Sequence, residues 1–227
     1  MALAANALCT LTEVKTELSI TVATHDAYLE SLINYASTAI ENFLNRKLGK
    51  VTDKVEKVPG YGGCRIRLSL TPVLSFSEVS IVEPYLPATP VDISDVTLED
   101  SGAGFLYYRS GWPWTVPLEA GSIVPNPLVG QEQKAIEVKY TGGYILPNDA
   151  GPTLPADIER ACILIVAYEY NRRGQTRGVK SESLMSYSVT FENAVGSTAT
   201  QAKLFPSSPF PSEAMMILLP YRRVNGA

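Results

Sequence analysis

The chain has 227 residues, of which 45% are hydrophobic and 19% charged, and this balance excludes a disordered chain. Its length suffices for one domain, or for one domain with a sizeable insertion, around a hydrophobic core. The 23 acidic and 19 basic residues leave a formal net charge of -4, which argues against a protein whose whole surface grips nucleic acid.

The three cysteines do not follow the pattern of a bridged or metal-bound protein. Cys9, Cys64 and Cys162 are odd in number, far apart and without C-x-x-C spacing, so neither a disulfide framework nor a zinc site is predicted. No basic segment followed by a long apolar run opens the chain, and no apolar stretch approaches the roughly 20 residues of a membrane span. We therefore expect a protein made in a reducing cytoplasm, with no membrane partner.

Two helices are predicted before residue 50. Thr10 and Glu13 have the spacing of a capping box, so a helix is expected from Thr10 to about Leu18. A longer amphipathic helix is expected from Asp26 to Lys47, because its apolar residues recur every three or four positions. Gly49 is placed to end this helix with a left-handed cap.

The middle of the chain changes to the alternating pattern of β-strands. Alternation predicts strands at Cys64–Leu70, Val79–Val82 and Ile136–Tyr140, separated by clusters of Gly, Pro and Asp. Such short, regularly interrupted strands indicate a small antiparallel sheet or sandwich. Gly60–Gly63 is interpreted as a hairpin turn, and the Pro- and Gly-rich stretch 115–133 as a long loop.

Helical periodicity returns after residue 150. A helix should begin at Pro155, run to about Arg172 and end by Gly174, and its middle is apolar on every side and should be buried. Met185–Phe191 alternates as a strand. A Ser- and Pro-rich stretch, 196–212, then leads to a short apolar segment, Ala214–Leu219.

The predicted fold class is α+β: a helical bundle of three main helices and a short C-terminal segment, with an inserted antiparallel β-rich subdomain. The expected division has four consecutive parts. They are the N-terminal helices of the bundle (1–50), the β-rich insertion (51–140), the buried central helix with the following strand (141–195), and a flexible lead-in with a C-terminal docking arm (196–227).

Residues for catalysis are scarce. The sequence has no G-x-S-x-G, Walker-type, G-x-G-x-x-G or H-E-x-x-H motif, and its one histidine, His25, has no cysteine or second histidine near it. The carboxylates Asp92, Asp95, Glu99 and Asp100 could in principle form an acid/base pair, but solvated turn residues explain them better. We predict no catalytic residue, no metal site and no cofactor.

Two other groups suggest contact surfaces. The basic cluster Arg172, Arg173, Arg177 and Lys180 follows the buried helix, where it could face DNA phosphates or an acidic protein, or merely favour the negative end of the helix dipole. Protein contact is preferred over DNA because no aromatic residue interleaves the cluster. A group of aromatic side chains is expected to pack in a core or a subunit interface rather than to stack on sugars or bases: Tyr107, Tyr108, Trp112 and Trp114.

The order of several segments resembles the head–tail connector (adaptor) proteins of long-tailed bacteriophages. The resemblance is strongest in "IEVKYTGGYILPND" followed by "LPADIERACILIVAYEYNRRG", a strand, a Gly-Gly-Tyr turn and a Pro-started buried helix. It also includes "LTEVK" from Leu11, "LESLINYASTAIENFLNRKL" from Leu29, "LTPVLSFSEVSIV" from Leu70 and "FPSEAMMILLPYRR" near the end. The β insertion, about residues 51–135, departs from the compact all-helical members and is similar to the larger variants of some phages and of gene transfer agents.

The resemblance implies a structural virion protein, not an enzyme. It would form a ring, commonly of twelve subunits, in the neck at the head–tail interface, assembled in the host cytoplasm. Its partners would be the portal, a downstream neck or tail protein and, transiently, the passing DNA, which an acidic channel lets slide. The C-terminal segment would dock on the portal, and its deletion after Glu213 should leave the fold intact. Its candidate contact residues are Met215, Met216, Ile217, Leu218, Tyr221, Arg222 and Arg223.

Two alternatives stay open. The chain could be another phage neck or tail-completion protein of similar build. It could also be a carbohydrate-active enzyme that uses the carboxylates and aromatic residues of the β-rich part.

Overall fold

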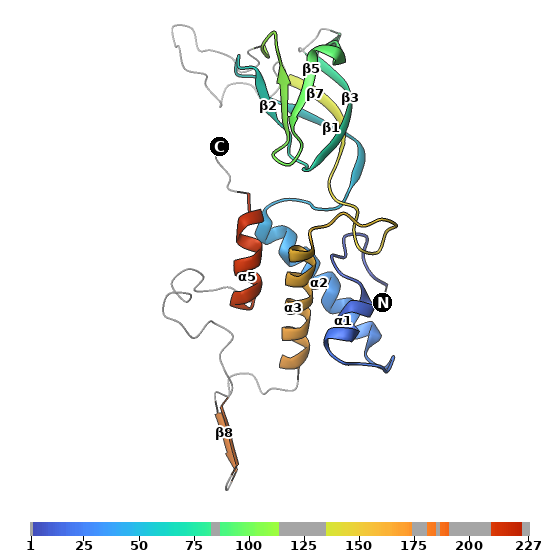
Figure 1. Ribbon diagram of the computed structural model, residues 1–227, viewed down its shortest axis with the longest axis vertical. Coiled ribbons are helices and arrows are strands. Elements are labelled where there is room, and N and C mark those ends of the chain that lie inside the picture. The colour runs from blue at the N-terminus through green and yellow to red at the C-terminus, as the bar shows by residue number, and fades with distance from the viewer. Residues whose placement is uncertain are drawn as a thin grey trace. The chain divides into compact units, whose positions relative to one another are not determined.

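The computed structural model describes residues 2–82, 87–113, 135–173, 181–184, 187–190 and 210–223. Two compact units are present, one within residues 1–46 and 145–227 and the other within residues 47–144. The first is helical and the second is made of antiparallel strands, so the predicted α+β class, with the β-rich part inserted between helices, is confirmed (Figure 1).

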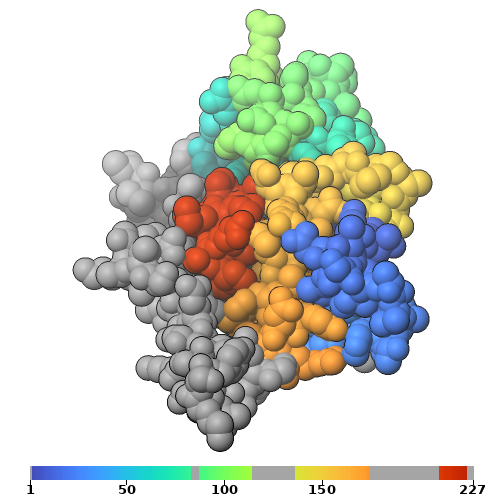
Figure 2. All heavy atoms as spheres, turned by 60° about the horizontal axis from the view of Figure 1, so that its bottom comes forward, coloured from blue at the N-terminus to red at the C-terminus, as the bar shows by residue number. Residues whose placement is uncertain are grey.

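The helical unit is built from α1 (Leu11–Glu17), α2 (Asp26–Leu44), α3 (Ala156–Arg172) and α5 (Ser212–Leu218). α3 packs against each of the other three, and α1 and α5 lie on either side of it (Figures 1 and 2). The predicted burial of α3 is confirmed over most of its middle, because Cys162, Ile163, Ile165 and Val166 are all buried. This central position makes α3 the main support of the helical core.

The start of α1 follows the local sequence signal, whereas the end of α2 departs from it. α1 starts at the predicted capping box, in which Thr10 and Glu13 each bond the backbone of the other. α2 ends earlier than predicted, at Leu44, because Asn45 takes the left-handed conformation (φ 55°) that was expected of Gly49. Gly49 instead forms a parallel bridge with Tyr144 in the β unit.

The β unit holds two antiparallel sheets. The larger has the strand order β1-β7-β3-β4 and the smaller has the order β2-β6-β5. The strands are β1 (Val51–Val58), β2 (Arg65–Arg67), β3 (Val73–Val82), β4 (Thr89–Pro90), β5 (Val96–Asp100), β6 (Phe105–Tyr108) and β7 (Ala135–Gly142), with a 3-10 turn η1 (Ile93–Asp95) before β5.

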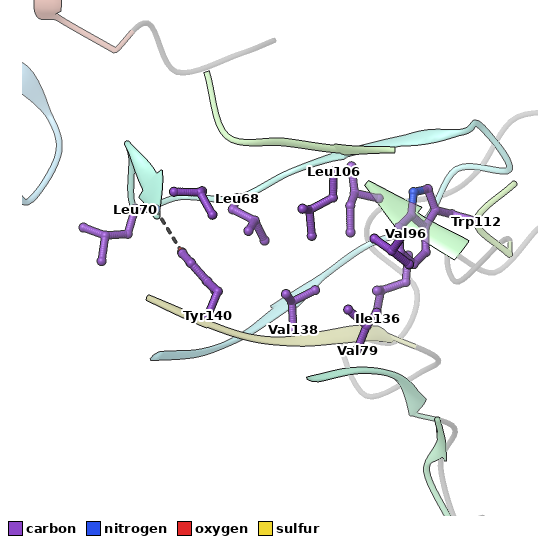
Figure 3. Close-up of a cluster of buried hydrophobic side chains, with 11 residues drawn as sticks. Leu68, Leu70, Val79, Val96, Leu106, Trp112, Ile136, Val138 and Tyr140 are labelled. Carbon is purple, nitrogen blue, oxygen red and sulfur yellow. Dashed lines mark hydrogen bonds between the residues drawn. The ribbon is translucent and has the colours of Figure 1, made fainter. Parts of the chain in front are cut away.

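The core of the β unit lies between these two sheets. Side chains from both sheets and from the loops beside them point toward one another in Figure 3, as in a small sandwich. Trp112 is the largest of these side chains, and its indole Nε1–H donates to the Cys64 carbonyl at 3.1 Å. Burying this set removes its apolar surface from water and gives the β unit a core of its own.

The interpretation of Gly60–Gly63 as a hairpin turn is wrong. β1 pairs with β7, whereas β2 pairs with β6, so the segment between β1 and β2 carries the chain from one sheet to the other. The reason is that a local Gly-rich pattern marks a change of direction without specifying which strands it joins.

The Gly-Gly-Tyr turn has a direct steric explanation. A Cβ atom on Gly142 would lie 2.8 Å from the Leu70 carbonyl oxygen, and one on Gly143 would lie 2.5 Å from the carbonyl oxygen of Gly49. Gly143 also has a φ of 93°, a conformation that favours glycine. These glycines therefore allow β7 to end in close contact with the segment that enters the β unit.

The strand predicted at Met185–Phe191 is confirmed over β9 (Tyr187–Thr190). It pairs antiparallel with β8 (Ser181–Leu184), a strand that was not predicted. Met185, Ser186, Phe191, the predicted loop 115–133, Gly174 and the lead-in as far as residue 209 lie outside the described residues.

Candidate functional site

The C-terminal helix α5 has buried apolar residues on one face and exposed apolar residues on the other. Ala214, Met215 and Leu218 are buried against the helical unit, with Met215 only 2% exposed. Met216 on the opposite face is 61% exposed, and Leu219 just beyond the helix is 42% exposed. Met215 and Leu218 therefore belong to the unit's own core, which corrects their proposed use as anchors for a partner.

The end of the chain is fixed to the helical unit over its last described residues. Tyr221, in the short turn η2 (Leu219–Tyr221), donates to Asp157 at the start of α3 across 3.2 Å. The Arg222 guanidinium lies 5.2 Å from the centre of the Phe43 ring, and the Arg223 N–H donates to the Leu44 carbonyl. This segment therefore packs on the helical unit, which argues against the expectation that the fold stays intact when the segment is deleted.

The first half of the basic cluster is surrounded by aromatic rings. Arg173 lies 5.3 Å from the centre of the Tyr28 ring and 5.4 Å from that of Tyr170, while Arg172 lies 5.4 Å from that of Tyr168. The argument that no aromatic residue interleaves the cluster is therefore wrong, because α2 and α3 bring these rings together in space. Arg177 and Lys180 lie outside the described residues.

His25 belongs to the same group of side chains. It precedes α2 without capping it through its side chain, and its ring meets Tyr170 edge-on with centroids 5.9 Å apart. Its Nδ1 lies 3.4 Å from an Arg173 nitrogen. Such surroundings place His25 in a packed aromatic and arginine cluster, beside a cation rather than beside a carboxylate that could orient it as a base.

Three of the four carboxylates that the sequence singled out in the β unit have structural partners, and the fourth, Asp95, lies in the turn η1. Asp92 caps η1 by accepting from the backbone and hydroxyl of Ser94, and these hydrogen bonds hold the pKa of Asp92 below its usual range. Glu99 forms a bidentate ion pair with Arg65, and Asp100 accepts from the Ala103 N–H at 2.9 Å. Turn and strand geometry therefore accounts for these groups without a catalytic role.

The aromatic group singled out in the sequence packs within the β unit as far as its members are described. Trp112 is 2% exposed, and its ring centroid lies 4.9 Å from that of Tyr108. Tyr107 on β6 is half-buried, and Trp114 lies outside the described residues. Trp112 therefore packs inside the unit and is not available as a stacking platform.

A polar network at one end of the β core was not predicted from the sequence. The Tyr140 hydroxyl donates to the Glu56 carboxylate and accepts from the Leu70 N–H at 3.0 Å (Figure 3 shows the second bond). Glu56 also accepts from the Ser69 hydroxyl at 2.6 Å and from Lys54 at 3.0 Å. Burial acts to raise the pKa of Glu56, but these hydrogen bonds outweigh it and hold that pKa below its usual range. The Glu56 carboxylate, with its pKa held low by these partners, is suited to anchoring strands rather than to accepting a proton.

The buried cysteines meet in the core of the helical unit. Cys9 and Cys162 are fully buried free thiols with their sulfur atoms 3.4 Å apart, although 153 positions separate them in the sequence. The prediction that Cys162 is a small core residue is confirmed. The hydrogen bond to Cys162 and burial raise the pKa of the Cys9 thiol, so both factors disfavour a reactive thiolate.

The described residues contain neither a metal-binding cluster nor a membrane-spanning helix. Within the described ranges, no group of three or more His, Cys, Asp or Glu side chains is arranged to hold a metal ion. Among the helices that the structure describes, none is long and apolar enough to span a membrane.

Comparison with solved structures finds full-length similarity to proteins of gene transfer agent particles. A chain from "Neck of empty GTA particle computed with C6 symmetry" is 17% identical, with a TM-score of 0.52, and the alignment covers 100% of this chain and 95% of that one. A chain from "Neck of native GTA particle computed with C12 symmetry" is 17% identical, with a TM-score of 0.51 and coverage of 100% and 94%. At this identity the likeness shows a shared fold.

A search of curated protein sequences gave no significant match. The family model described as "Head completion protein" matches residues 7–224, which is nearly the whole chain and includes both units. The expected relationship to phage head–tail connector proteins is thereby confirmed at the level of the family. The chain belongs to the head completion protein family.

Proposed function

We propose that this protein is the adaptor ring of a phage-like neck, placed between portal and tail, with the genome passing through the ring. The observation that carries the proposal is the full-length match to the head completion family, with its fold shared by chains from particle necks. The twelvefold symmetry named for one of those necks supports a ring of twelve copies. A downstream neck or tail protein would bind the opposite side of the ring.

The acidic balance of the chain suits this role. A net charge of -4 per copy gives a ring that does not hold DNA phosphates tightly, so that a passing genome can slide. Arg172 and Arg173 are the described basic residues with which passing DNA would make transient contact. Arg172 is partly neutralised by Glu169 at 3.4 Å, which limits how strongly it can hold a phosphate.

The portal contact is assigned to the outer face of α5. Met216 and Leu219 are exposed there, with Ile217 half-buried between them, while Met215 and Leu218 hold the helix on its own unit. A rigid apolar face of this kind binds at lower entropic cost than a mobile arm. The exposed Arg222 beside it would add charge complementarity to an acidic partner.

The test is to mix the purified protein with the portal of the same particle and to image the complex by electron microscopy. The wild type should form a ring on the portal, and the double variant Met216→Glu with Leu219→Glu should lose portal binding while keeping its helical circular dichroism. Val55→Glu is the matched control, because Val55 is 54% exposed but lies on the β unit. A map that placed the protein away from the portal would favour the role of another neck or tail-completion protein.

A further inference from the structure

The outward face of α2 is free of charged side chains along nearly its whole length. Its positions repeat at intervals of three and four, which places them on one side of the helix. Over about 22 Å of helix axis the face therefore offers only small, hydroxyl, amide, aromatic and aliphatic groups. Its members are Ala27, Tyr28, Ser31, Leu32, Tyr35, Thr38, Ala39 and Asn42.

This face is not the ordinary solvated side of an amphipathic helix. Such sides usually carry charges, and the exposed positions of α3 do so with Asp157, Arg160 and Arg172. The three acidic residues of α2 lie off this face: Asp26 pairs with Lys15 at 2.7 Å, Glu41 is 3% exposed, and Glu30 comes at a helix position about 140° round from Tyr35.

The centre of the face is its most exposed apolar part. Tyr35 is 50% exposed and Tyr28 is 37% exposed, and Arg173 covers part of the Tyr28 ring. Leu32 lies between the two tyrosines on the same side of the helix. A strip whose own side chains are uncharged, with a protruding aromatic residue at its centre and an arginine only at its Tyr28 end, is typical of the part of an interface that is buried on association.

We propose that this face of α2 binds a second copy of the same chain and forms the side-to-side contact of the ring; the inference rests on the proposed function. Every copy carries the same net charge of -4, and a contact made by uncharged side chains adds no further like-charge repulsion between neighbouring copies. A closed ring also needs one surface on each subunit that meets a different surface of the next. The α2 face provides such an uncharged contact and supplies one of the two surfaces that a closed ring requires.

The size of the face sets how the ring assembles. A strip about 22 Å long and about 10 Å wide offers roughly 220 Å², well below the roughly 800 Å² per partner of a standard stable interface. Contacts through α2 alone are therefore too small to hold two free copies together. We expect a monomer in dilute solution and cooperative assembly once a portal holds neighbouring copies side by side.

The first experiment compares Tyr35→Glu with Tyr61→Glu during assembly on the portal, with subunits per portal counted by native mass spectrometry. Tyr61 is the matched control, since it is an exposed tyrosine (59%) on the β unit. The Tyr35→Glu variant should still bind as single copies but close rings about tenfold less readily, because a charge is buried without a partner. Ring closure equal to that of the wild type would overturn the inference and leave the proposed function standing.

The second experiment does not depend on the portal. Tyr35 is replaced by the photo-crosslinking residue p-benzoylphenylalanine, and concentrated protein and intact particles are irradiated and mapped by mass spectrometry. Crosslinks to a second copy support the inference. Crosslinks only to another neck protein, or none at all, overturn it. A wild type that fails to bind portal while still crosslinking to itself would refute the proposed function alone.

Discussion

Met215 and Met216 are adjacent residues of the same type on opposite faces of α5, and they make a matched pair of substitutions. Met215 is 2% exposed and Met216 is 61% exposed. Replacing Met215 by Ala removes a buried side chain from the contact between α5 and α3 and should lower the free energy of unfolding by about 2–4 kcal/mol. The same change at Met216 should cost less than about 0.5 kcal/mol, because its side chain is mostly in water already.

The assay is urea unfolding followed by two signals. Far-UV circular dichroism reports mainly on the helices, whereas tryptophan fluorescence reports on the β unit, because both tryptophans, Trp112 and Trp114, lie in its part of the chain. The Met215→Ala transition should move to lower urea only by circular dichroism. Equal transitions for the two variants would refute the burial of Met215, and with it the statement that α5 belongs to the helical core.

Three further predictions concern the other polar and thiol groups. Tyr140→Phe should cost the β unit about 1–3 kcal/mol, seen by fluorescence during urea unfolding, because it leaves a buried backbone N–H without its acceptor. Burial first, and then the neighbouring carboxylate of α1, raise the pKa of Glu159 to about 7. The folded state thus holds the Glu159 proton more tightly than the unfolded chain does. The free energy of unfolding should therefore fall by about 1 kcal/mol, after solvent screening, as pH rises from about 4.5 to 7. Glu159→Gln should flatten this pH dependence of stability, and an unchanged pH dependence would contradict the raised pKa of Glu159. Maleimide should label Cys64 at neutral pH, whereas Cys9 and Cys162 should react only in denaturant, as peptide mass mapping would show.

Signals that act over a few residues were readable from the sequence. The capping box at Thr10 fixed the start of α1, and the apolar run after Pro155 located α3 to within a residue. The end of α2 was missed because two residues could each take a left-handed cap, and Asn45 comes first along the chain.

Contacts between distant parts of the chain could not be predicted in the same way. The Cys9–Cys162 pair and the bond from Tyr140 to Glu56 depend on how helices and strands pack, not on spacing along the chain. The orientation of α5 was also hard to predict, because its apolar run places a methionine on each of two opposite faces. Met215 and Met216 fit an inward position equally well until the location of α3 is known.

The two crossings between the units meet at a single point of the β unit. The Tyr144 N–H donates to the Leu48 carbonyl, and the Lys50 N–H donates to the Tyr144 carbonyl, both at 2.8 Å. The inserted unit therefore begins and ends at the same place, as a cassette does. A short peptide would close the chain after excision of the unit, at a small cost in loop entropy. The helical unit and the inserted unit can then change independently of one another, because a single pair of hydrogen-bonded chain segments joins them.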